Sequence, residues 1–204
     1  MRKLIFGAAA VALLVACQTS PTDDPPRATA ALQPTKGNKA FGEATFEQAG
    51  DKVRVIVFAQ GLKPNAEHGF HIHEAGDCSS GDGMSAKGHF NPHGKPHGNP
   101  ASPERHAGDL PSLKADKGGR AKIDVTIDAV SIGQGAGNIV GRGLIIHADP
   151  DDYKTQPTGN AGARLACGVI KAGSRRCPSR PIPRRRGSYS TPSTAGWRAK
   201  WRRA

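Results

Sequence analysis

The histidines of this 204-residue chain are spaced in a way that could bind metal ions. His71 and His73 are separated by one residue, so in a β-strand both imidazoles would lie on one face, with Phe70 and Ile72 on the other. Two imidazoles on one face form half of a metal site. Alone the pair is a weak signal, since structural or surface histidines at this spacing are at least as common.

A second group follows further along the chain. It comprises His89, His97, His106 and Asp109, separated by seven, eight and two residues. Three nitrogens and one carboxylate oxygen match a four-coordinate zinc site. Four imidazoles suit Cu(II), and they would come from His71, His73, His89 and His147. The alternative is a His-rich tract of low specificity, but such tracts are repetitive, whereas these histidines extend over 77 positions.

The elements that must position these side chains are β-strands. Alternating or β-branched apolar residues predict strands over 38–47, 52–60, 69–74, 120–130, 138–147 and 164–170. Residues 48–51, Gln-Ala-Gly-Asp, indicate a turn between the first two. No segment has a long helical period. Short strands separated by Gly- and Pro-containing turns predict an all-β sandwich or barrel.

Two long connections interrupt the strands. Residues 75–113 span 39 positions with seven Gly and five Pro. A loop of this length inside a compact domain needs something to organise it, and a bound metal can replace the missing hydrophobic core. The second connection, 148–163, contains Asp149, Asp151, Asp152 and Lys154 and lies between His147 and Arg164.

The first residues of the chain indicate export. Arg2 and Lys3 precede a run of thirteen apolar residues, 4–16, which is too short to span a bilayer comfortably. The following Leu-Val-Ala-Cys, 14–17, resembles a bacterial lipobox, in which Cys17 is lipidated and becomes the first mature residue. The alternative is an ordinary cleaved signal peptide. We therefore expect a lipoprotein signal over 1–16, a flexible tether over 17–35 and a periplasmic, membrane-anchored domain over 36–171.

The basic charge is confined to the ends of the chain. The net charge is +12, but residues 172–204 carry ten Lys or Arg and no acid, and residues 4–171 are neutral. The charge therefore gives no reason to expect a specific nucleic-acid partner for the domain. For the tail we expect disorder, with adhesion to anionic surfaces as a functional alternative in which Trp197 and Trp201 form a short interfacial helix.

Cysteine use agrees with export. Cys78 and Cys167 lie in the globular region, and an oxidising compartment makes a disulfide the default expectation. Cys177 is left over in the tail, either free or paired between chains.

Four segments resemble the signatures of copper,zinc superoxide dismutases. They are 69–74 (GFHIHE), 88–92 (GHFNP), 106–110 (HAGDL) and 159–170 (GNAGARLACGVI), in the order and spacing of that family. The resemblance covers 36–171 and, with the lipobox, is closest to the bacterial periplasmic lipoprotein type. It implies an eight-stranded Greek-key β-barrel with two long functional loops. It also implies conversion of two superoxide anions and two protons to O2 and H2O2 by alternate reduction and reoxidation of copper, which would protect the cell envelope.

The resemblance also implies a role for each site residue. Copper would be held by His71, His73, His89 and His147, and zinc by His89, His97, His106 and Asp109, so that His89 bridges the two. Asp151 would link His71 to His97, and Arg164 would guide the substrate. Cys78 would pair with Cys167, His68 would tie the backbone together, and His93 matches no ligand position.

Two other functions are compatible with parts of the sequence. A copper- and zinc-buffering protein on the same fold would bind the metals without turnover, but such relatives lose copper ligands or the arginine, and here all are present. A polyanion-binding protein would use the basic tail and would show salt-sensitive binding. Whether the chain is a monomer or a homodimer is left open.

Overall fold

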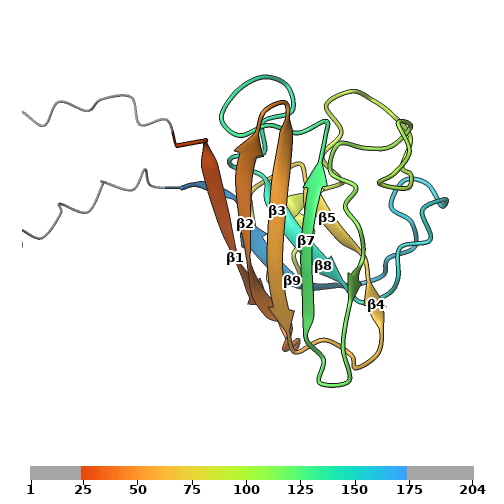
Figure 1. Cartoon of the computed structure of the whole chain (residues 1–204). Helices are drawn as coiled ribbons and strands as arrows, with labels where there is room; N and C mark the ends of the chain where they lie inside the picture. Colours follow the sequence, from red (N-terminus) through yellow and green to blue (C-terminus); the bar gives the residue numbers. More distant parts are fainter. Residues whose placement is uncertain (1–23, 174–204) are drawn as a thin grey trace, which may run out of the picture.

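The computed structural model describes residues 24–173 (Figure 1). The predicted export signal, Cys17, Cys177 and the tail from residue 174 lie outside the described residues.

The described domain is all-β, as predicted. Its strands are β1 (Arg27–Pro34), β2 (Phe41–Ala49), β3 (Lys52–Gln60), β4 (Glu67–His68), β5 (Phe70–His73), β6 (Leu113–Lys114), β7 (Ala121–Ile127), β8 (Gly143–His147), β9 (Arg164–Val169) and β10 (Lys171–Ala172). In residues 24–173 the only helix is the 3-10 turn η1 (Met84–Ala86), and no helix could cross a membrane.

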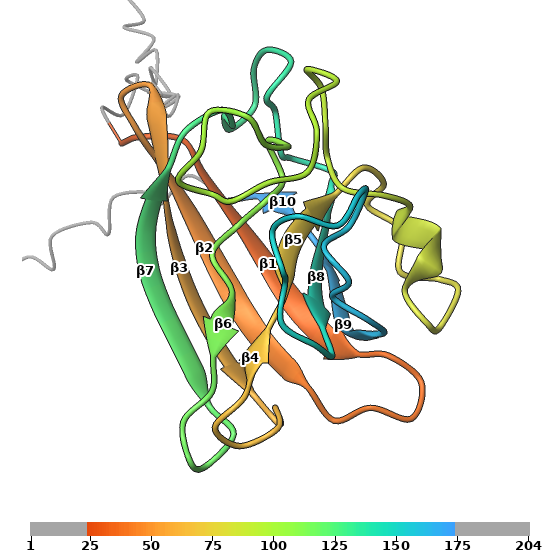
Figure 2. The ribbon, with the colours of Figure 1, turned by 90° about the vertical axis from the view of Figure 1, so that its right-hand side faces the viewer.

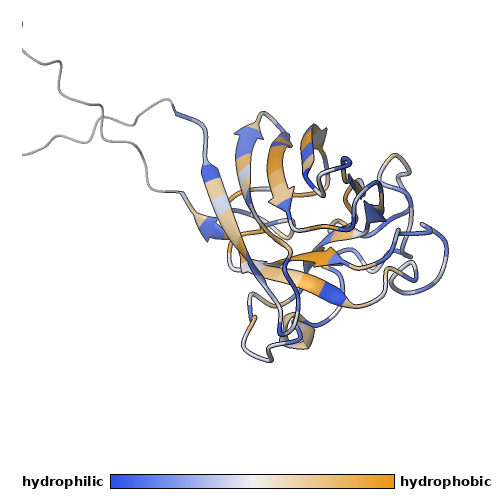
Figure 3. Ribbon diagram, turned by 90° about the horizontal axis from the view of Figure 1, so that it is seen from below, coloured by the Kyte–Doolittle hydropathy of each residue, from blue (hydrophilic) through white to orange (hydrophobic). Residues whose placement is uncertain are grey.

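The eight-stranded antiparallel sheet has the order β5-β8-β9-β1-β2-β3-β7, and β10 pairs with β1; β4 and β6 form a separate two-stranded sheet. The large sheet curls so that β1, β2, β3 and β7 face β5, β8 and β9 (Figure 1). Inward-facing side chains alternate with exposed ones, as in β3, where Val53, Val55, Val57 and Ala59 are buried. The apolar strands therefore enclose the core, whereas the loops are largely polar (Figure 3).

The expected tether is wrong for residues 27–34, which form β1 at the centre of the sheet order. Ala28, Ala30 and Leu32 are buried in the core, and β1 pairs with both β2 and β9. The segment is rich in Ala, which has weak strand propensity, so its two neighbours rather than its own composition select the strand. At the other end Ala172 pairs with Ala28, so the folded unit also extends past residue 171.

The two long connections, 74–112 and 148–163, lie on the same side of the sheet (Figure 2). The first is joined to β9 by the disulfide Cys78–Cys167, with a Cα–Cα distance of 5.8 Å, as predicted. The two ends of the described chain leave together on the opposite side, since Gly173 N–H donates to the Arg27 carbonyl at 2.7 Å (Figures 1 and 3).

Candidate metal centre

The first group of ligand candidates, here called the four-histidine set, forms where β5 lies beside β8. It consists of His71, His73, His89 and His147, all buried, and one nitrogen from each lies within 4.8 Å of the others. Pairing of β5 with β8 presents His71 and His73 to one side, while the side chains of Phe70 and Ile72 are fully buried in the core. The strand periodicity therefore determines which side chains enter the site.

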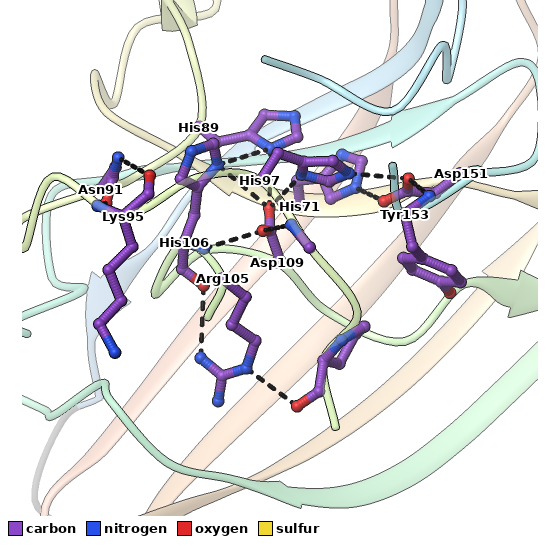
Figure 4. Close-up of polar contacts among 12 residues, drawn as sticks. His71, His89, Asn91, Lys95, His97, Arg105, His106, Asp109, Asp151 and Tyr153 are labelled. Atoms are coloured by element: carbon purple, nitrogen blue, oxygen red, sulfur yellow. Dashed lines mark hydrogen bonds and ion pairs between the residues drawn. The ribbon is translucent and has the colours of Figure 1, made fainter. Parts of the chain in front are cut away.

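The second group, here called the aspartate set, is built largely from the first long connection. It consists of His89, His97, His106 and Asp109, again all buried and within 4.8 Å. Asp109 is its centre (Figure 4). Its Oδ1 lies 2.8, 3.0 and 3.4 Å from the Nδ1 atoms of His89, His97 and His106. Its Oδ2 accepts backbone N–H bonds from Gly98 and His106, which fix the carboxylate.

His89 belongs to both sets. Its Nδ1 lies beside Asp109, while its Nε2 is buried without a hydrogen-bond partner and its ring lies 4.0 Å from the ring of His71. Nδ1 of His71 is also buried and unpartnered. Buried polar atoms normally have a partner, so two such nitrogens in one cluster are explained if a bound ion completes them. The residues therefore fit a metal ion on this side of His89.

Hydrogen bonds fix which nitrogen each of the other histidines presents. Nδ1 of His73 donates to the Lys87 carbonyl at 2.8 Å, and Nδ1 of His147 donates to the Gly162 carbonyl at 3.2 Å. In a neutral imidazole this leaves a lone pair on Nε2. The two Nε2 atoms lie 3.3 Å apart. Two lone pairs at this distance repel unless a cation or proton is shared, which again fits a metal ligand pair.

Asp151 joins the two sets. Its Oδ2 lies 2.7 Å from Nε2 of His71, and its Oδ1 lies 2.9 Å from Nε2 of His97 (Figure 4). Each ring nitrogen directed at the carboxylate carries the proton, so the other nitrogen is available to a metal. The Tyr153 backbone N–H donates to Oδ1 and holds the carboxylate in place.

Residues 40–170 match the family model for copper/zinc superoxide dismutase (SODC). The chain belongs to the copper/zinc superoxide dismutase family. It is 45% identical over 151 residues to "Superoxide dismutase [Cu-Zn] 2" of Aquifex aeolicus (strain VF5), covering 71% of this chain and 86% of that protein. It is also 45% identical over 141 residues to "Superoxide dismutase [Cu-Zn]" of Schizosaccharomyces pombe, covering 65% and 90%.

A solved structure is also similar to this chain in fold and sequence. The structure titled "Crystal Structure Analysis of the clock protein EA4" is 42% identical in sequence, with a TM-score of 0.66, and the match covers 72% of this chain and 94% of that one. The metals of a copper/zinc superoxide dismutase are copper and zinc, and the two ligand sets suit them in number and in chemistry.

The environment of this copper/zinc superoxide dismutase site favours the neutral form of three of its imidazoles. Burial lowers the pKa of His89 to about 4 and that of His147 to about 3, and it also lowers the pKa of His73 well below its ordinary value. His97 differs. Burial also acts to lower its pKa, but hydrogen bonds to Asp109 and Asp151 outweigh burial and raise it to about 9. A proton held there in the metal-free protein must leave before zinc binds.

Arg164 lies at the start of β9, beside the four-histidine set. Its Nη1 donates to the Gly83 carbonyl and its Nη2 to the Lys87 carbonyl, both at 2.6 Å. Burial lowers its pKa, but the group remains a cation. Because the Lys87 carbonyl also accepts the bond from His73, one backbone oxygen ties the guanidinium to a histidine of the set.

Two residues that position the site were given no role from the sequence. The Gln156 side chain accepts from His97 N–H and donates to the His97 carbonyl, both at 2.8 Å, and so joins the two long connections. Gly159 has a φ of +65°, and a Cβ there would collide with the Asp151 carboxylate and lie 2.6 Å from Nε2 of His97. Neither residue type signals a metal site, so only the fold reveals them.

The remaining histidines lie outside both sets. His68 is fully buried, and its Nδ1 donates to the His147 carbonyl at 2.8 Å. It therefore links the backbone of β8 to β4 and has a structural role. His93 is exposed and lies in neither set.

Proposed function

We propose that this chain is a superoxide dismutase in which the four-histidine set holds copper and the aspartate set holds zinc. The observation that carries the residue assignment is the position of His89. One of its nitrogens faces Asp109, and the other faces the four-histidine set without any partner in the protein.

When bound, copper supplies the one-electron chemistry that superoxide disproportionation needs, which zinc lacks. The protein's own part is to place ligands and protons. Nδ1 of His89 stays directed at the aspartate set, so the ring keeps its position while Nε2 can hold a proton. Two superoxide anions need two protons to give O2 and H2O2, and Nε2 of His89 is one place from which a proton can be delivered.

Arg164 is the group that receives the substrate anion. Its guanidinium is fixed by the Gly83 and Lys87 carbonyls, so it need not reorganise when the anion arrives. The disulfide Cys78–Cys167 joins the segment bearing these carbonyls to β9, which carries Arg164. The arginine and the two oxygens that orient it are thus held on covalently linked elements.

Superoxide consumption by purified variants tests this assignment. His147→Ala should lower turnover by more than a hundredfold because it removes a copper ligand, and Arg164→Ala should lower kcat/KM by about tenfold or more. His93→Ala, an exposed histidine outside both sets, is the matched control and should keep wild-type turnover. Full copper and zinc loading of the wild-type protein without turnover would contradict the proposal and indicate a metal-buffering protein.

We further propose that the chain is an exported lipoprotein of the bacterial periplasm, anchored through Cys17, whose basic tail contacts anionic surfaces. The sequence motif supports the anchor, and the position of the chain ends is consistent with it. Residues 27 and 173 lie next to each other on the side away from the long connections (Figure 1). A chain tethered there would present its metal centre away from the membrane.

A further inference from the structure

Tyr153, in the second long connection, has a backbone conformation that few aromatic residues adopt. Its φ is +57°, in the left-handed region that favours glycine and asparagine. Its side chain is half-buried. A bulky residue in this conformation needs an explanation, and the contacts of its hydroxyl group supply one.

The hydroxyl group of Tyr153 binds the end of the first long connection. It accepts a hydrogen bond from the Ser112 backbone N–H at 3.1 Å, and it lies 2.9 Å from Ser112 Oγ, with which it forms a second hydrogen bond. Ser112 is buried and lies three residues after Asp109, the centre of the aspartate set. Its neighbours Leu110 and Leu113 are buried in the core, so its backbone is firmly held. The hydroxyl group therefore joins the second connection to a fixed position close to Asp109.

The backbone of Tyr153 binds the other carboxylate of the site. Its N–H donates to Oδ1 of Asp151 at 2.8 Å, and the same oxygen lies 2.9 Å from Nε2 of His97 (Figure 4). Nδ1 of His97 lies 3.0 Å from Oδ1 of Asp109. The imidazole of His97 is thus held between two carboxylates, one from each long connection.

These contacts form a closed circuit. It runs from His97 to Asp109, along the chain to Ser112, through the hydroxyl group and backbone of Tyr153 to Asp151, and back to His97. Gln156 also joins the two connections, but it binds the backbone of His97 and not the carboxylates beside its ring. The distance between those two carboxylates therefore depends on the contact between Tyr153 and Ser112.

We propose that Tyr153 is a positioning residue for the zinc ligand His97, and that its hydroxyl group, anchored on Ser112, sets the spacing of the two carboxylates that orient the ring. This inference rests on the proposed assignment of zinc to the aspartate set. Tyr153 acts through Asp151, which its backbone N–H orients. Loss of the hydroxyl group would keep every ligand but would let Asp151 shift relative to Asp109. Zinc would then be held less tightly.

Tyr153→Phe tests the hydroxyl group alone. Competition with a chelator measures the Kd for zinc of the copper-loaded protein, and we expect this Kd to rise roughly fivefold in Tyr153→Phe. Ser112→Ala removes one of the two hydrogen bonds and should raise it less. Tyr189→Phe, the same change at the other tyrosine of the chain, is the matched control and should keep the wild-type Kd. A wild-type Kd in Tyr153→Phe would overturn the proposal.

The effect of zinc on stability separates positioning from a purely structural role. A hydroxyl group that only stabilises the fold contributes equally to the metal-free and the zinc-loaded protein, so its loss leaves the stabilisation by zinc unchanged. A positioning hydroxyl group contributes more when zinc is bound. The increase in the free energy of unfolding on addition of zinc should therefore be smaller in Tyr153→Phe than in the wild type. Equal increases in the two proteins would overturn the proposal.

Failure of the proposed function would look different. A wild-type protein that binds no zinc would contradict the zinc assignment. Hydrogen exchange in the metal-free protein would then test Tyr153 by itself, because the amide of residue 153 reports on its hydrogen bond to Asp151. Faster exchange of this amide in Tyr153→Phe than in Tyr189→Phe supports the positioning role, and equal rates overturn it.

Discussion

At the scale of single residues, the site is defined by which nitrogen of each imidazole forms a hydrogen bond within the protein. Backbone carbonyls accept hydrogen bonds from Nδ1 of His73 and of His147, and Asp151 accepts one from Nε2 of His71. One nitrogen of each histidine in the four-histidine set lies within 4.8 Å of the others, and the Nε2 atoms left on His73 and His147 are 3.3 Å apart. The ligand atoms are therefore selected before any metal arrives, which reduces the reorganisation that binding requires.

Asp151 should matter to both metals although it belongs to neither ligand set. Asp151→Asn keeps the size of the side chain, but its single amide oxygen cannot replace the two carboxylate oxygens that accept hydrogen bonds from His71 and His97. We expect retention of zinc against a chelator to weaken by about 10- to 100-fold, and retention of copper to weaken as well. Asp152→Asn, at the exposed neighbour, is the control and should retain both metals. Unchanged retention in Asp151→Asn would show that the carboxylate does not position the ligands.

The metal-free protein should lose stability in mild acid. His89 and His147 have pKa values of about 4 and 3 when folded and regain the ordinary value of 6.5 on unfolding. The unfolded chain thus binds more protons, and stability falls as pH drops from about 6.5 to 5, by up to about 1.4 kcal/mol per pH unit for each histidine. His97, with a raised pKa of about 9, stabilises the fold below pH 6.5 and loses that effect only toward pH 9.

Melting temperatures of the metal-free protein between pH 5 and 7 measure this effect. The wild-type value should decrease below pH 6.5, and His147→Asn should decrease less steeply. A melting temperature that is constant or rises toward pH 5 would contradict the neutral state assigned to these buried imidazoles.

At the scale of elements, the least obvious strand is β1. The sequence predicts β2, β3, β5, β7, β8 and β9 to within a few residues, because their β-branched residues alternate or their histidines mark them. The short pairs β4–β6 and β1–β10 have no such signal and arise only when distant segments meet. The same is true of Gln156 and Gly159, whose roles depend on contacts between the two long connections.

Truncation tests the corrected boundary. A chain that begins at residue 24 keeps β1 and should fold with wild-type turnover. A chain that begins at residue 36 leaves the backbone edges of β2 and β9 unpaired where β1 bonds to them, and removes Ala28, Ala30 and Leu32 from the core. We expect it to lack a cooperative unfolding transition. A stable, active chain from residue 36 would restore the tether interpretation for residues 27–34.

At the scale of the whole molecule, the chain ends and the metal centre lie on opposite sides of the sheet (Figures 1 and 3). If Cys17 carries the lipid, Cys17→Ser should move the protein from the membrane to the soluble fraction of the periplasm, with turnover unchanged. Removal of residues 174–204 should also leave turnover unchanged, since β10 ends at Ala172. A more than few-fold loss on tail removal would place the tail within the catalytic unit.

The central claim is that one imidazole, His89, serves two metal ions. Titration of the metal-free chain with zinc and then copper, followed by metal analysis, tests it most directly. We predict one zinc and one copper per chain, reduced affinity for both metals in His89→Ala, and reduced affinity mainly for zinc in His106→Ala. Binding of a single metal ion, or a His89→Ala variant that loses affinity for only one metal, would contradict the shared site.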